Sequence, residues 1–171
     1  MSHAAFLDLH GTLVLPLAVD RLDELRVIPG AEDAVARLCA AGFVCPVVTV
    51  QSRIAKGAYS EAEFRAWFDG FARQMQGAGG RVSPYICPHR FSDPCACKKP
   101  QALLYEQAAR DLEIDLHASF VVGDTSADVE AAQRFGGRGY LLRDGATLAD
   151  AVEWILGATP AHEAHQAPRE P

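Results

Sequence analysis

Apolar and polar residues follow two different periodicities along the chain, and their alternation predicts a series of strands and helices. Short, nearly continuous apolar runs at 4–9, 43–50, 82–87, 119–122 and 140–142 are typical of strands buried on both faces. Apolar residues recur at helical spacing at 31–41, from 60 to about 76, and at 101–112, 127–135 and 147 to about 156. Strands that alternate with helices predict a mainly parallel sheet covered on both faces, an α/β/α sandwich of three layers.

Residues with strong terminal preferences mark where several of these helices begin. Ser60 followed by Glu63 fits a capping box, so we expect a helix to start there. Pro100 suits a first helical position and predicts a helix that continues from residue 101. Thr147 with Asp150 predicts the start of the last helix.

The spacing of these elements indicates one domain over residues 1–157. Residues 15–28 form only a short connection, which leaves no room for a separate cap domain. Residues 158–171 contain three prolines and little that could pack, so we expect a disordered tail. The N-terminus lacks the charged and apolar regions of a signal peptide, and no run of 18 apolar residues predicts a membrane helix. We therefore expect a cytoplasmic protein with no membrane partner.

Composition and charge narrow the classes of partner. The chain is 49% hydrophobic and 22% charged, as expected of a globular protein. Its net charge of −6 argues against nucleic acid as the main partner. An odd number of cysteines without a secretion signal does not suggest a disulfide framework. The five cysteines are Cys39, Cys45, Cys87, Cys95 and Cys97. The last three lie within eleven residues and suggest a metal site.

Polar side chains stand at or just past the carboxyl ends of three predicted strands. They are Asp8, Thr49 and Asp124. Ligands of open parallel sheets bind beyond these ends, so the three groups are expected to share one crevice. Two neighbouring carboxylates repel each other unless a cation lies between them, and Mg²⁺ prefers such oxygen ligands. A carboxylate can also act as a nucleophile. The alternative is that both aspartates are ordinary loop residues.

Four short motifs occur in one order and resemble those of the haloacid dehalogenase (HAD) superfamily of phosphohydrolases. "DLHGT" at 8–12 resembles the first motif, whose usual form is D-x-D-G-T, and "VVTVQS" at 47–52 resembles the second. "CKKP" at 97–100 resembles the third, and "GDTSAD" at 123–128 resembles the acidic fourth. Together they span roughly residues 4–142. The resemblance implies a HAD-like Rossmannoid fold, a phosphatase and, by default, a monomer.

A closer resemblance exists to the D-glycero-D-manno-heptose 1,7-bisphosphate phosphatases and the related histidinol-phosphate phosphatases. It rests on "QSRIAKGAYSEAEF" after the second motif and on "CPH" and "CACKKP". Those enzymes carry a zinc loop of the form C-x-H…C-x-C-[RK]-K-P. The matching residues are Cys87, His89, Cys95 and Cys97, a closed set that structural zinc prefers. Such a zinc ion would pin the loop that carries Lys98 and Lys99. Buried thiols beside an unrelated histidine are the alternative.

The resemblance also implies roles for individual residues. Asp8 would attack phosphorus and form an aspartyl-phosphate, and Thr49 and Lys99 would bind the phosphoryl oxygens. Mg²⁺ would be held by Asp8, Asp124 and the backbone carbonyl of His10.

His10 is the main departure from the family pattern, because it stands where the second aspartate of the first motif normally transfers protons. Imidazole can both donate and accept a proton near working pH. A misplaced proton-transfer group costs about 10²- to 10⁴-fold in rate. His10 is therefore a working substitute, the mark of a slow or inactive phosphate-binding member, or an engineered change, and the sequence leaves these three interpretations open.

Further departures concern the substrate. Arg53 stands where the heptose enzymes typically have glycine, Val50 where asparagine is usual, and Thr125 where the fourth motif often has lysine. Arg53 either binds a second anionic group of the substrate or is a solvated loop residue. The expected phosphate and substrate contacts are Thr49, Gln51, Ser52, Arg53, Lys56, Lys98 and Lys99.

The sequence thus predicts a Mg²⁺-dependent phosphatase of a small phosphorylated metabolite, such as a heptose bisphosphate or histidinol phosphate. A catalytically weak phosphate-binding homologue is the main alternative. A zinc-ribbon-like interaction module is a weaker third.

Overall fold

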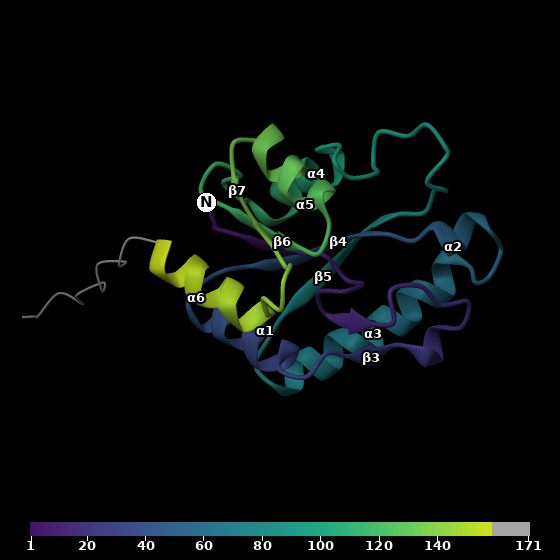
Figure 1. The fold of residues 1–171 in the computed structure, drawn as a ribbon, viewed down its shortest axis with the longest axis horizontal. Helices are drawn as coiled ribbons and strands as arrows, with labels where there is room; N and C mark the ends of the chain where they lie inside the picture. Colours follow the sequence, from purple (N-terminus) through teal and green to yellow (C-terminus); the bar gives the residue numbers. More distant parts are fainter. Residues whose placement is uncertain (159–171) are drawn as a thin grey trace, which may run out of the picture.

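A five-stranded parallel sheet forms the centre of the computed structural model, which describes residues 1–158 (Figure 1). The strand order is β5-β4-β1-β6-β7. The strands are β1 (Ala5–Leu7), β4 (Cys45–Val50), β5 (Val82–Cys87), β6 (Phe120–Gly123) and β7 (Arg138–Leu141). All four pairings between neighbours are parallel. The three central strands are buried along nearly their whole length, which explains their continuous apolar runs.

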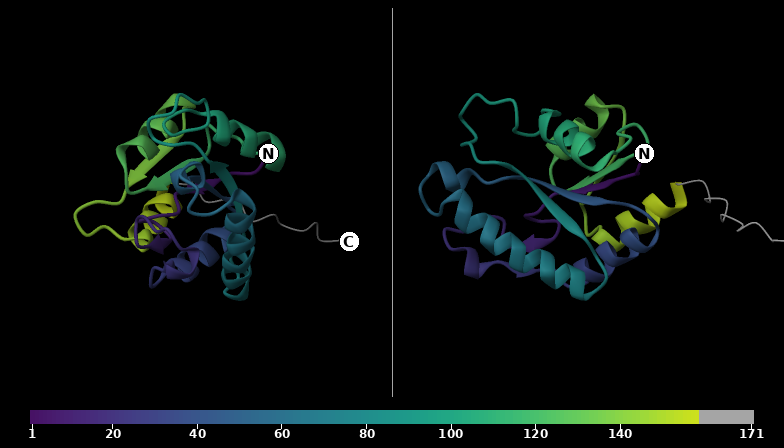
Figure 2. Two further views of the ribbon diagram at one scale, coloured as in Figure 1. Left: turned by 90° about the vertical axis from the view of Figure 1, so that its right-hand side faces the viewer. Right: turned by 180° about the vertical axis from the view of Figure 1, so that it is seen from behind.

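Helices cover both faces of the sheet, as the views in Figure 2 show. One face carries α1 (Ala31–Ala40), α3 (Glu61–Gly77) and α6 (Leu148–Ala158), and the other carries α4 (Leu103–Leu112) and α5 (Ser126–Arg134). Each layer buries its own apolar core against the sheet. Phe64, Phe68 and Ile155 lie in one core, and Phe6 and Tyr105 lie in the other. The predicted three-layer α/β/α sandwich is confirmed.

The segment between β1 and α1 is more ordered than the sequence indicated. Residues 15–28, expected to be a simple connection, include one strand of a small antiparallel pair, β2 (Val14–Leu15) with β3 (Arg26–Val27), and the 3₁₀ turn η1 (Leu22–Glu24). Strands of two residues are too short to produce a recognisable periodicity. The short helix α2 (Ser52–Ala55) was also not predicted, for the same reason.

The predicted helix starts are correct at Ser60 and at Thr147, which caps α6 together with Asp150, and the start predicted at Pro100 is wrong. The Ser60–Glu63 capping box is confirmed: the Glu63 amide donates to Ser60 Oγ over 3.1 Å, and the Ser60 amide donates to Glu63 Oε2 over 2.7 Å. Pro100 does not open a helix. A turn closed by Gln101 N donating to Lys98 O at 2.9 Å follows the thiol-rich loop, and α4 begins only at Leu103. The tail expected after residue 157 lies, from residue 159 onward, outside the described residues.

The strand order places a crevice at the middle of the sheet. From β1 the chain moves outward to β4 and β5, and it then returns to form β6 and β7 on the other side of β1. The topological switch point therefore lies between β1 and β6. Ligands of such sheets bind beyond the carboxyl ends of the strands at this point. Within residues 1–158 no helix combines the length and the apolar character needed to cross a membrane.

Candidate active site

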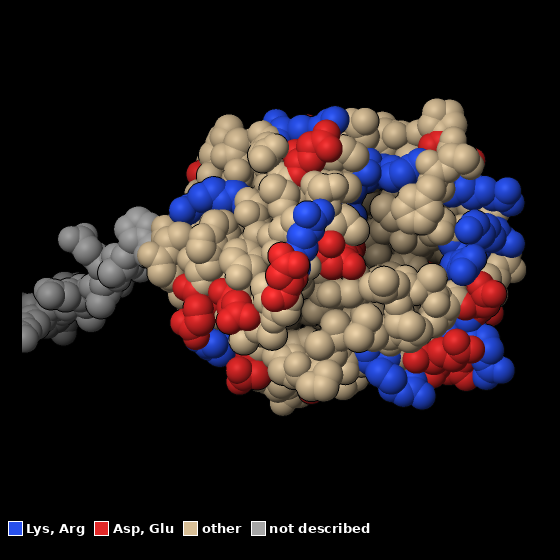
Figure 3. Space-filling model, in the orientation of Figure 1, with Lys and Arg blue, Asp and Glu red and all other residues tan. Residues whose placement is uncertain are grey.

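Four functional side chains predicted from the sequence line one cavity at the carboxyl ends of the strands. Asp8 follows β1, Thr49 lies near the end of β4, Asp124 follows β6, and Lys99 comes from the loop after β5. The cavity has a volume of about 240 Å³. Figure 3 shows this face of the molecule hollowed near its middle. The convergence expected from the strand ends is therefore present.

The turn after β1 brings the backbone against the carboxylate of Asp124. Gly11 has φ +79°, a conformation that side chains rarely adopt, and a Cβ at this position would collide with the Asp124 carboxyl group. The Gly11 amide donates to the Val14 carbonyl at 2.9 Å, which closes the turn. Glycine is thus required both by the turn and by the close approach of two strand ends.

Lys99 joins two buried carboxylates. Its Nζ lies 2.6 Å from Asp8 Oδ1 and 2.7 Å from Asp128 Oδ1, and all three side chains are largely buried. Burial acts to lower the pKa of Lys99, but the attraction of Asp8 and Asp128 is greater and raises it. Burial raises the pKa of Asp8, and the ammonium of Lys99 opposes that rise. Lys99 therefore remains charged and holds the Asp8 carboxylate in place.

Asp128 is a site residue that the sequence analysis did not identify. Its Oδ1 accepts from Lys99, and its Oδ2 accepts from the Thr125 hydroxyl at 2.7 Å and the Thr125 amide at 3.2 Å. Both oxygens are therefore occupied, and the fully buried carboxylate positions Lys99. A signal was present in "GDTSAD", but an acid three residues after a threonine is equally typical of a helix cap.

The oxygen groups of this crevice fit a divalent cation. One carboxylate oxygen from each of Asp8, Asp124 and Asp128 lies within 4.8 Å of the others, and Lys99 is the ammonium that pairs with two of them. Burial, and then the charge of Asp128, raise the pKa of Asp124, although Lys99 opposes the rise. Asp128 already accepts hydrogen bonds at both oxygens, so Asp8 and Asp124 are the side chains better suited to hold Mg²⁺. We call these four residues the aspartate crevice.

His10, which lines the same cavity, is held by two hydrogen bonds. Its Nδ1 lies 3.2 Å from the Pro16 carbonyl oxygen, and its Nε2 lies 3.1 Å from Nε2 of Gln51. A carbonyl oxygen only accepts, so Nδ1 carries the hydrogen. An amide nitrogen only donates, so the lone pair of His10 Nε2 faces Gln51. In this arrangement the proton-accepting atom of His10 is occupied by a protein donor.

Gln51 is itself fixed by two further partners. The Tyr59 hydroxyl donates to Gln51 Oε1 at 2.9 Å, and Gln51 Nε2 donates to Thr49 Oγ1 at 2.9 Å. Gln51 is almost fully buried, and both amide hydrogens are used, one on Thr49 and one on His10. Because Thr49 Oγ1 accepts from Gln51, its own hydrogen remains to be donated to an oxygen in the crevice. Tyr59 lies within the stretch "QSRIAKGAYSEAEF", but its role was not predicted, because the sequence does not show that its hydroxyl reaches Gln51.

The other predicted substrate contacts lie outside the crevice wall. Arg53 Nε is 3.0 Å from Asp20 Oδ1, and Lys98 Nζ donates to the carbonyl oxygens of Phe91 and Asp93 at 2.7 Å each. Lys56 is exposed at the end of α2. The roles of these three cations in substrate binding stay predictions. Ser52 is buried at the first position of α2.

The remaining wall of the cavity is largely apolar. Leu17, Val50, Phe91 and Ala127 line it beside the charged groups. Leu17 and Phe91 are 60% and 70% exposed, so they form an open rim. Neither residue was singled out from the sequence, because a single apolar residue in a loop carries no recognisable signal.

The four residues of the predicted zinc loop also come together. Cys87 Sγ lies 3.7 Å from Cys95 Sγ, 3.1 Å from Cys97 Sγ and 3.7 Å from His89 Nδ1, and His89 Nδ1 lies 3.2 Å from Cys97 Sγ. All four ligand atoms are within 4.8 Å of one another. We call residues 87–97 the thiol loop.

The chemistry of the thiol loop fits zinc. Three sulfurs and one imidazole nitrogen make up the tetrahedral set that structural zinc takes, with no position left for water. Burial raises the pKa of the Cys87 thiol to about 12, so a thiolate there needs a cation beside it. Cys97 is two residues before Lys99, and an ion bound by the loop would therefore fix the approach of Lys99 to Asp8.

Comparison with known families and curated proteins places this arrangement among phosphatases. Residues 96–167 match the family model described as HAD-hydrolase-like. The chain is 34% identical over 171 residues to the D-glycero-beta-D-manno-heptose-1,7-bisphosphate 7-phosphatase of Escherichia coli strain K12, covering 91% of this chain and 88% of that protein. It is 32% identical over 169 residues to the protein of the same name from Yersinia pestis, covering 91% and 90%.

Solved structures give the same result. The D,D-heptose 1,7-bisphosphate phosphatase of B. bronchiseptica, determined with magnesium and phosphate, superimposes with a TM-score of 0.80 at 30% identity, covering 92% of this chain and 99% of that one. A HAD-like phosphatase from Mesorhizobium loti superimposes with a TM-score of 0.79 at 27% identity, covering 90% and 86%.

Proposed function

The chain belongs to the HAD-like hydrolases, among the relatives of the heptose bisphosphate phosphatases, and we propose that it is a Mg²⁺-dependent phosphatase of a small phosphorylated sugar. The observation that carries the proposal is the aspartate crevice. A carboxylate held by a buried ammonium stands beside a second acid and a threonine hydroxyl at the switch point of a parallel sheet.

Asp8 is the proposed nucleophile. A carboxylate oxygen attacks phosphorus, the bond from phosphorus to the substrate oxygen breaks, and an aspartyl-phosphate forms. Lys99 holds Asp8 Oδ1 at 2.6 Å, which leaves Oδ2 for the attack. A water then attacks the aspartyl-phosphate and regenerates the carboxylate while inorganic phosphate leaves.

Thr49 and Lys99 are the proposed phosphate ligands. The hydroxyl of Thr49 has its hydrogen available because Gln51 donates to its oxygen. Lys99 supplies positive charge beside the reacting oxygens, where preorganised donors are most effective. Asp8, Asp124 and the carbonyl of His10 would hold Mg²⁺, which when bound offsets the negative charge of the phosphoryl group.

His10 is the proposed proton carrier. To act as a base its Nε2 must exchange the hydrogen bond from Gln51 for one from water. This requirement favours the second candidate function, a catalytically weak phosphate-binding member of the family. An aspartate at position 10 would have a shorter side chain and two accepting oxygens, and it would not depend on one lone pair.

The substrate is proposed from the names of the relatives, which act on heptose 1,7-bisphosphate. A second phosphate requires a second cation. Arg53 already pairs with Asp20, and Lys98 is bound to two backbone carbonyls, so neither is set toward the cavity. The apolar rim of Leu17 and Phe91 provides a surface for a less polar group. Histidinol phosphate, a monophosphate with an aromatic ring, is therefore the second substrate to test.

The experiment is phosphate release by the zinc-loaded protein with Mg²⁺, for heptose 1,7-bisphosphate and histidinol phosphate, with the parent chain and His10→Asp. Turnover by the parent chain supports His10 as a proton carrier and identifies the substrate. Turnover by His10→Asp alone supports the second candidate function. The proposal is wrong if neither protein releases phosphate from any small phosphoester although both bind zinc and fold.

A further inference from the structure

A cavity of about 710 Å³ lies at the opposite end of the sheet from the aspartate crevice. It is formed by the end of α1, the starts of β4 and β5, and the turns that lead into both strands. The lining is mostly small and apolar, and its reactive side chains are Cys39, Cys45 and Arg81. The proposed phosphatase mechanism uses none of these residues.

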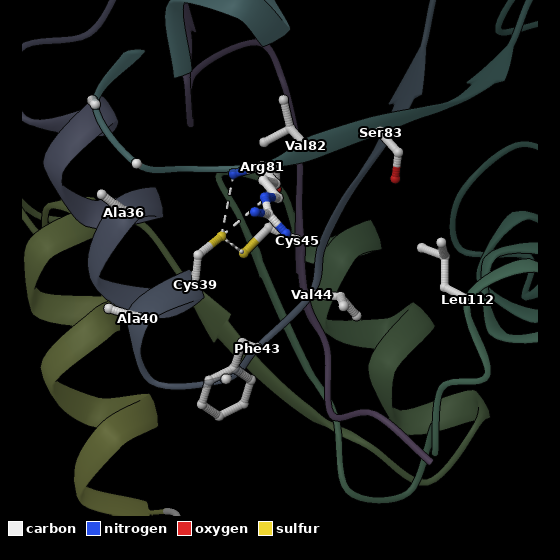
Figure 4. Close-up of a pocket in the computed structure, with 13 residues that line it drawn as sticks. Ala36, Cys39, Ala40, Phe43, Val44, Cys45, Arg81, Val82, Ser83 and Leu112 are labelled. Carbon is white, nitrogen blue, oxygen red and sulfur yellow. Dashed lines mark hydrogen bonds between the residues drawn. The ribbon is translucent and has the colours of Figure 1, made fainter. Parts of the chain in front are cut away.

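Two thiols face each other in this cavity. Cys39 lies in the last turn of α1, and Cys45 is the first residue of β4. Their sulfurs point toward one another in Figure 4 and are 3.8 Å apart. Both are free thiols. A short turn from 41 to 44 joins the two elements, so local structure brings the two thiols together.

The two thiols are chemically unequal. Cys45 is buried, with 3% of its surface exposed, whereas Cys39 is partly open to the cavity. The Arg81 amide donates to Cys39 Sγ at 3.3 Å, and its side chain lies beside the two sulfurs (Figure 4). The adjacent Cys45 thiol, and then Arg81, lower the pKa of Cys39 to about 6, while the same contact and burial raise the pKa of Cys45. Cys39 is therefore the nucleophile of the pair, and Cys45 is the thiol that donates to it.

The pair does not form a closed metal site. Structural zinc requires four protein ligands, and the cavity lining contains two sulfurs with no histidine or carboxylate. Among the described residues, the groups suited to a metal are those of the aspartate crevice and the thiol loop. Covalent thiol chemistry is what the arrangement does fit.

We propose that Cys39 and Cys45 form a peroxide-sensitive dithiol, in which Cys39 reacts first and Cys45 resolves the product to a disulfide. The Cys39 thiolate attacks one oxygen of hydrogen peroxide; the O–O bond breaks, sulfur is oxidised to a sulfenic acid and hydroxide leaves. Cys45 sulfur then attacks Cys39 sulfur; the S–S bond forms, the S–OH bond breaks and water leaves with the Cys45 proton. The sulfurs must approach by about 2 Å to reach disulfide length.

The chain offers a direct test, because trypsin releases residues 38–53 as one peptide that holds both cysteines and no other. The zinc-loaded full-length protein is treated with hydrogen peroxide, alkylated and digested with trypsin. The mass of the peptide is then measured by mass spectrometry. The expected result is loss of two hydrogen atoms, with no alkyl label on the peptide. Residues 91–98, which carry Cys95 and Cys97, form a separate peptide and report oxidation of the thiol loop.

Two variants assign the order of events. In Cys45→Ser the sulfenic acid on Cys39 should persist and react with dimedone. In Cys39→Ser no disulfide should form, and Cys45 should remain a thiol. The rate of alkylation of Cys39 in the untreated protein should rise with a midpoint near pH 6, about tenfold or more faster at pH 7 than an ordinary exposed thiol.

Three results would overturn the proposal. The first is a peptide 38–53 that keeps both thiols while the thiol loop is oxidised. The second is oxidation of Cys39 to sulfinic acid with Cys45 present and no disulfide. The third is a Cys39 alkylation midpoint at the ordinary thiol pKa of about 8.5. Phosphate release and zinc content in each variant serve as controls for correct folding.

Discussion

The aspartate crevice and the thiol loop both gather groups that bind cations, but only in the crevice does a side-chain cation pair with those groups. Lys99 pairs with Asp8 and Asp128 over 2.6 and 2.7 Å, so two of its three acids are already held by the protein. In the thiol loop the sulfurs of Cys87 and Cys97 lie 3.1 Å apart with no such counter-charge. Preorganisation therefore comes from an internal ion pair in the first region and requires a bound ion in the second.

This difference indicates different roles for the two expected metal ions. A crevice that keeps its shape without Mg²⁺ can release and rebind the ion, as a catalytic site must. A loop whose sulfurs lie against one another is expected to depend on a bound ion such as zinc for its shape, as a structural site does. The two regions meet at residues 97–99, so the order of the loop is expected to control the position of Lys99.

Removal of zinc should have the largest effect. Binding of zinc to a set of four such ligands is worth on the order of 10 kcal/mol in small peptides. Without an ion, the sulfurs of the thiol loop have only weak hydrogen bonds to one another and to backbone groups. A chelator should therefore loosen the loop, so that trypsin cleaves faster after Arg90, which is already exposed and is held by the Ala55 carbonyl. Cleavage elsewhere in the described chain should change little. Limited proteolysis with mass analysis measures this.

The matched control for zinc is the double variant Cys39→Ser and Cys45→Ser, which removes two thiols far from the loop. It should retain one zinc ion per chain, whereas Cys97→Ser should lose it. Equal zinc content in these two variants would contradict the assignment of the loop.

Replacement of the internal cation should have the next largest effect. Lys99→Met leaves Asp8 and Asp128 buried without a cation, which costs about 3–5 kcal/mol of unfolding free energy. Arg37→Met is the control, because Arg37 forms an exposed pair with Glu153 worth about 0–1 kcal/mol. Urea unfolding without Mg²⁺ measures both.

Added Mg²⁺ should recover part of the stability lost in Lys99→Met, since it supplies the missing charge. The comparison fails if Lys99→Met costs no more than Arg37→Met, or if Mg²⁺ stabilises the two variants equally.

The Gln51 network should contribute less. Gln51→Leu leaves the Tyr59 hydroxyl and His10 Nε2 without a partner, at a cost of about 1–3 kcal/mol in urea unfolding. Tyr59→Phe removes one donor only and should cost less. Nitrogen NMR of His10 should show the hydrogen on Nδ1 in the parent chain, and a hydrogen found on Nε2 instead would contradict the network.

The smallest effect is expected at the capping box of α3, which repeats on the surface the arrangement of Thr125 and Asp128. Ser60 and Glu63 have the spacing of Thr125 and Asp128, but Glu63 lies on the surface. Hydrogen bonds from the Ser60 amide and hydroxyl lower the pKa of Glu63, so its ionised form stabilises the folded state. This contribution is present above the usual carboxyl pKa and is lost as the pH falls through the lowered one.

Thermal unfolding of Glu63→Gln tests whether ionised Glu63 stabilises the folded state. The melting temperature should fall slightly below that of the parent chain at pH 7, and the difference should vanish in acid. Asp128→Asn should lower the melting temperature much more, because it also releases Lys99. Similar shifts in the two variants would mean that Asp128 is only a helix cap.

The sequence predicted the layers of the fold because its buried strands and amphipathic helices carry clear periodicities. It also placed Asp8, Thr49 and Asp124 at one edge of the sheet, since parallel strands bring their carboxyl ends together. Asp128 was missed because the spacing of a cap and the spacing of a site are the same. Tyr59 and the direction of Lys98 could not be predicted, because they depend on how loops pack and no local pattern encodes that packing.

Asp8 is the proposed nucleophile, and the rate of phosphate release by Asp8→Asn tests this directly. The rate is measured with Mg²⁺ in the parent chain and in the His10→Asp background, with exposed Asp23→Asn as the control and zinc content as the check on folding. Loss of the attacking carboxylate should lower the rate by about 10⁴-fold or more, while Asp23→Asn keeps the parent rate. An Asp8→Asn protein that retains the parent rate would contradict the account.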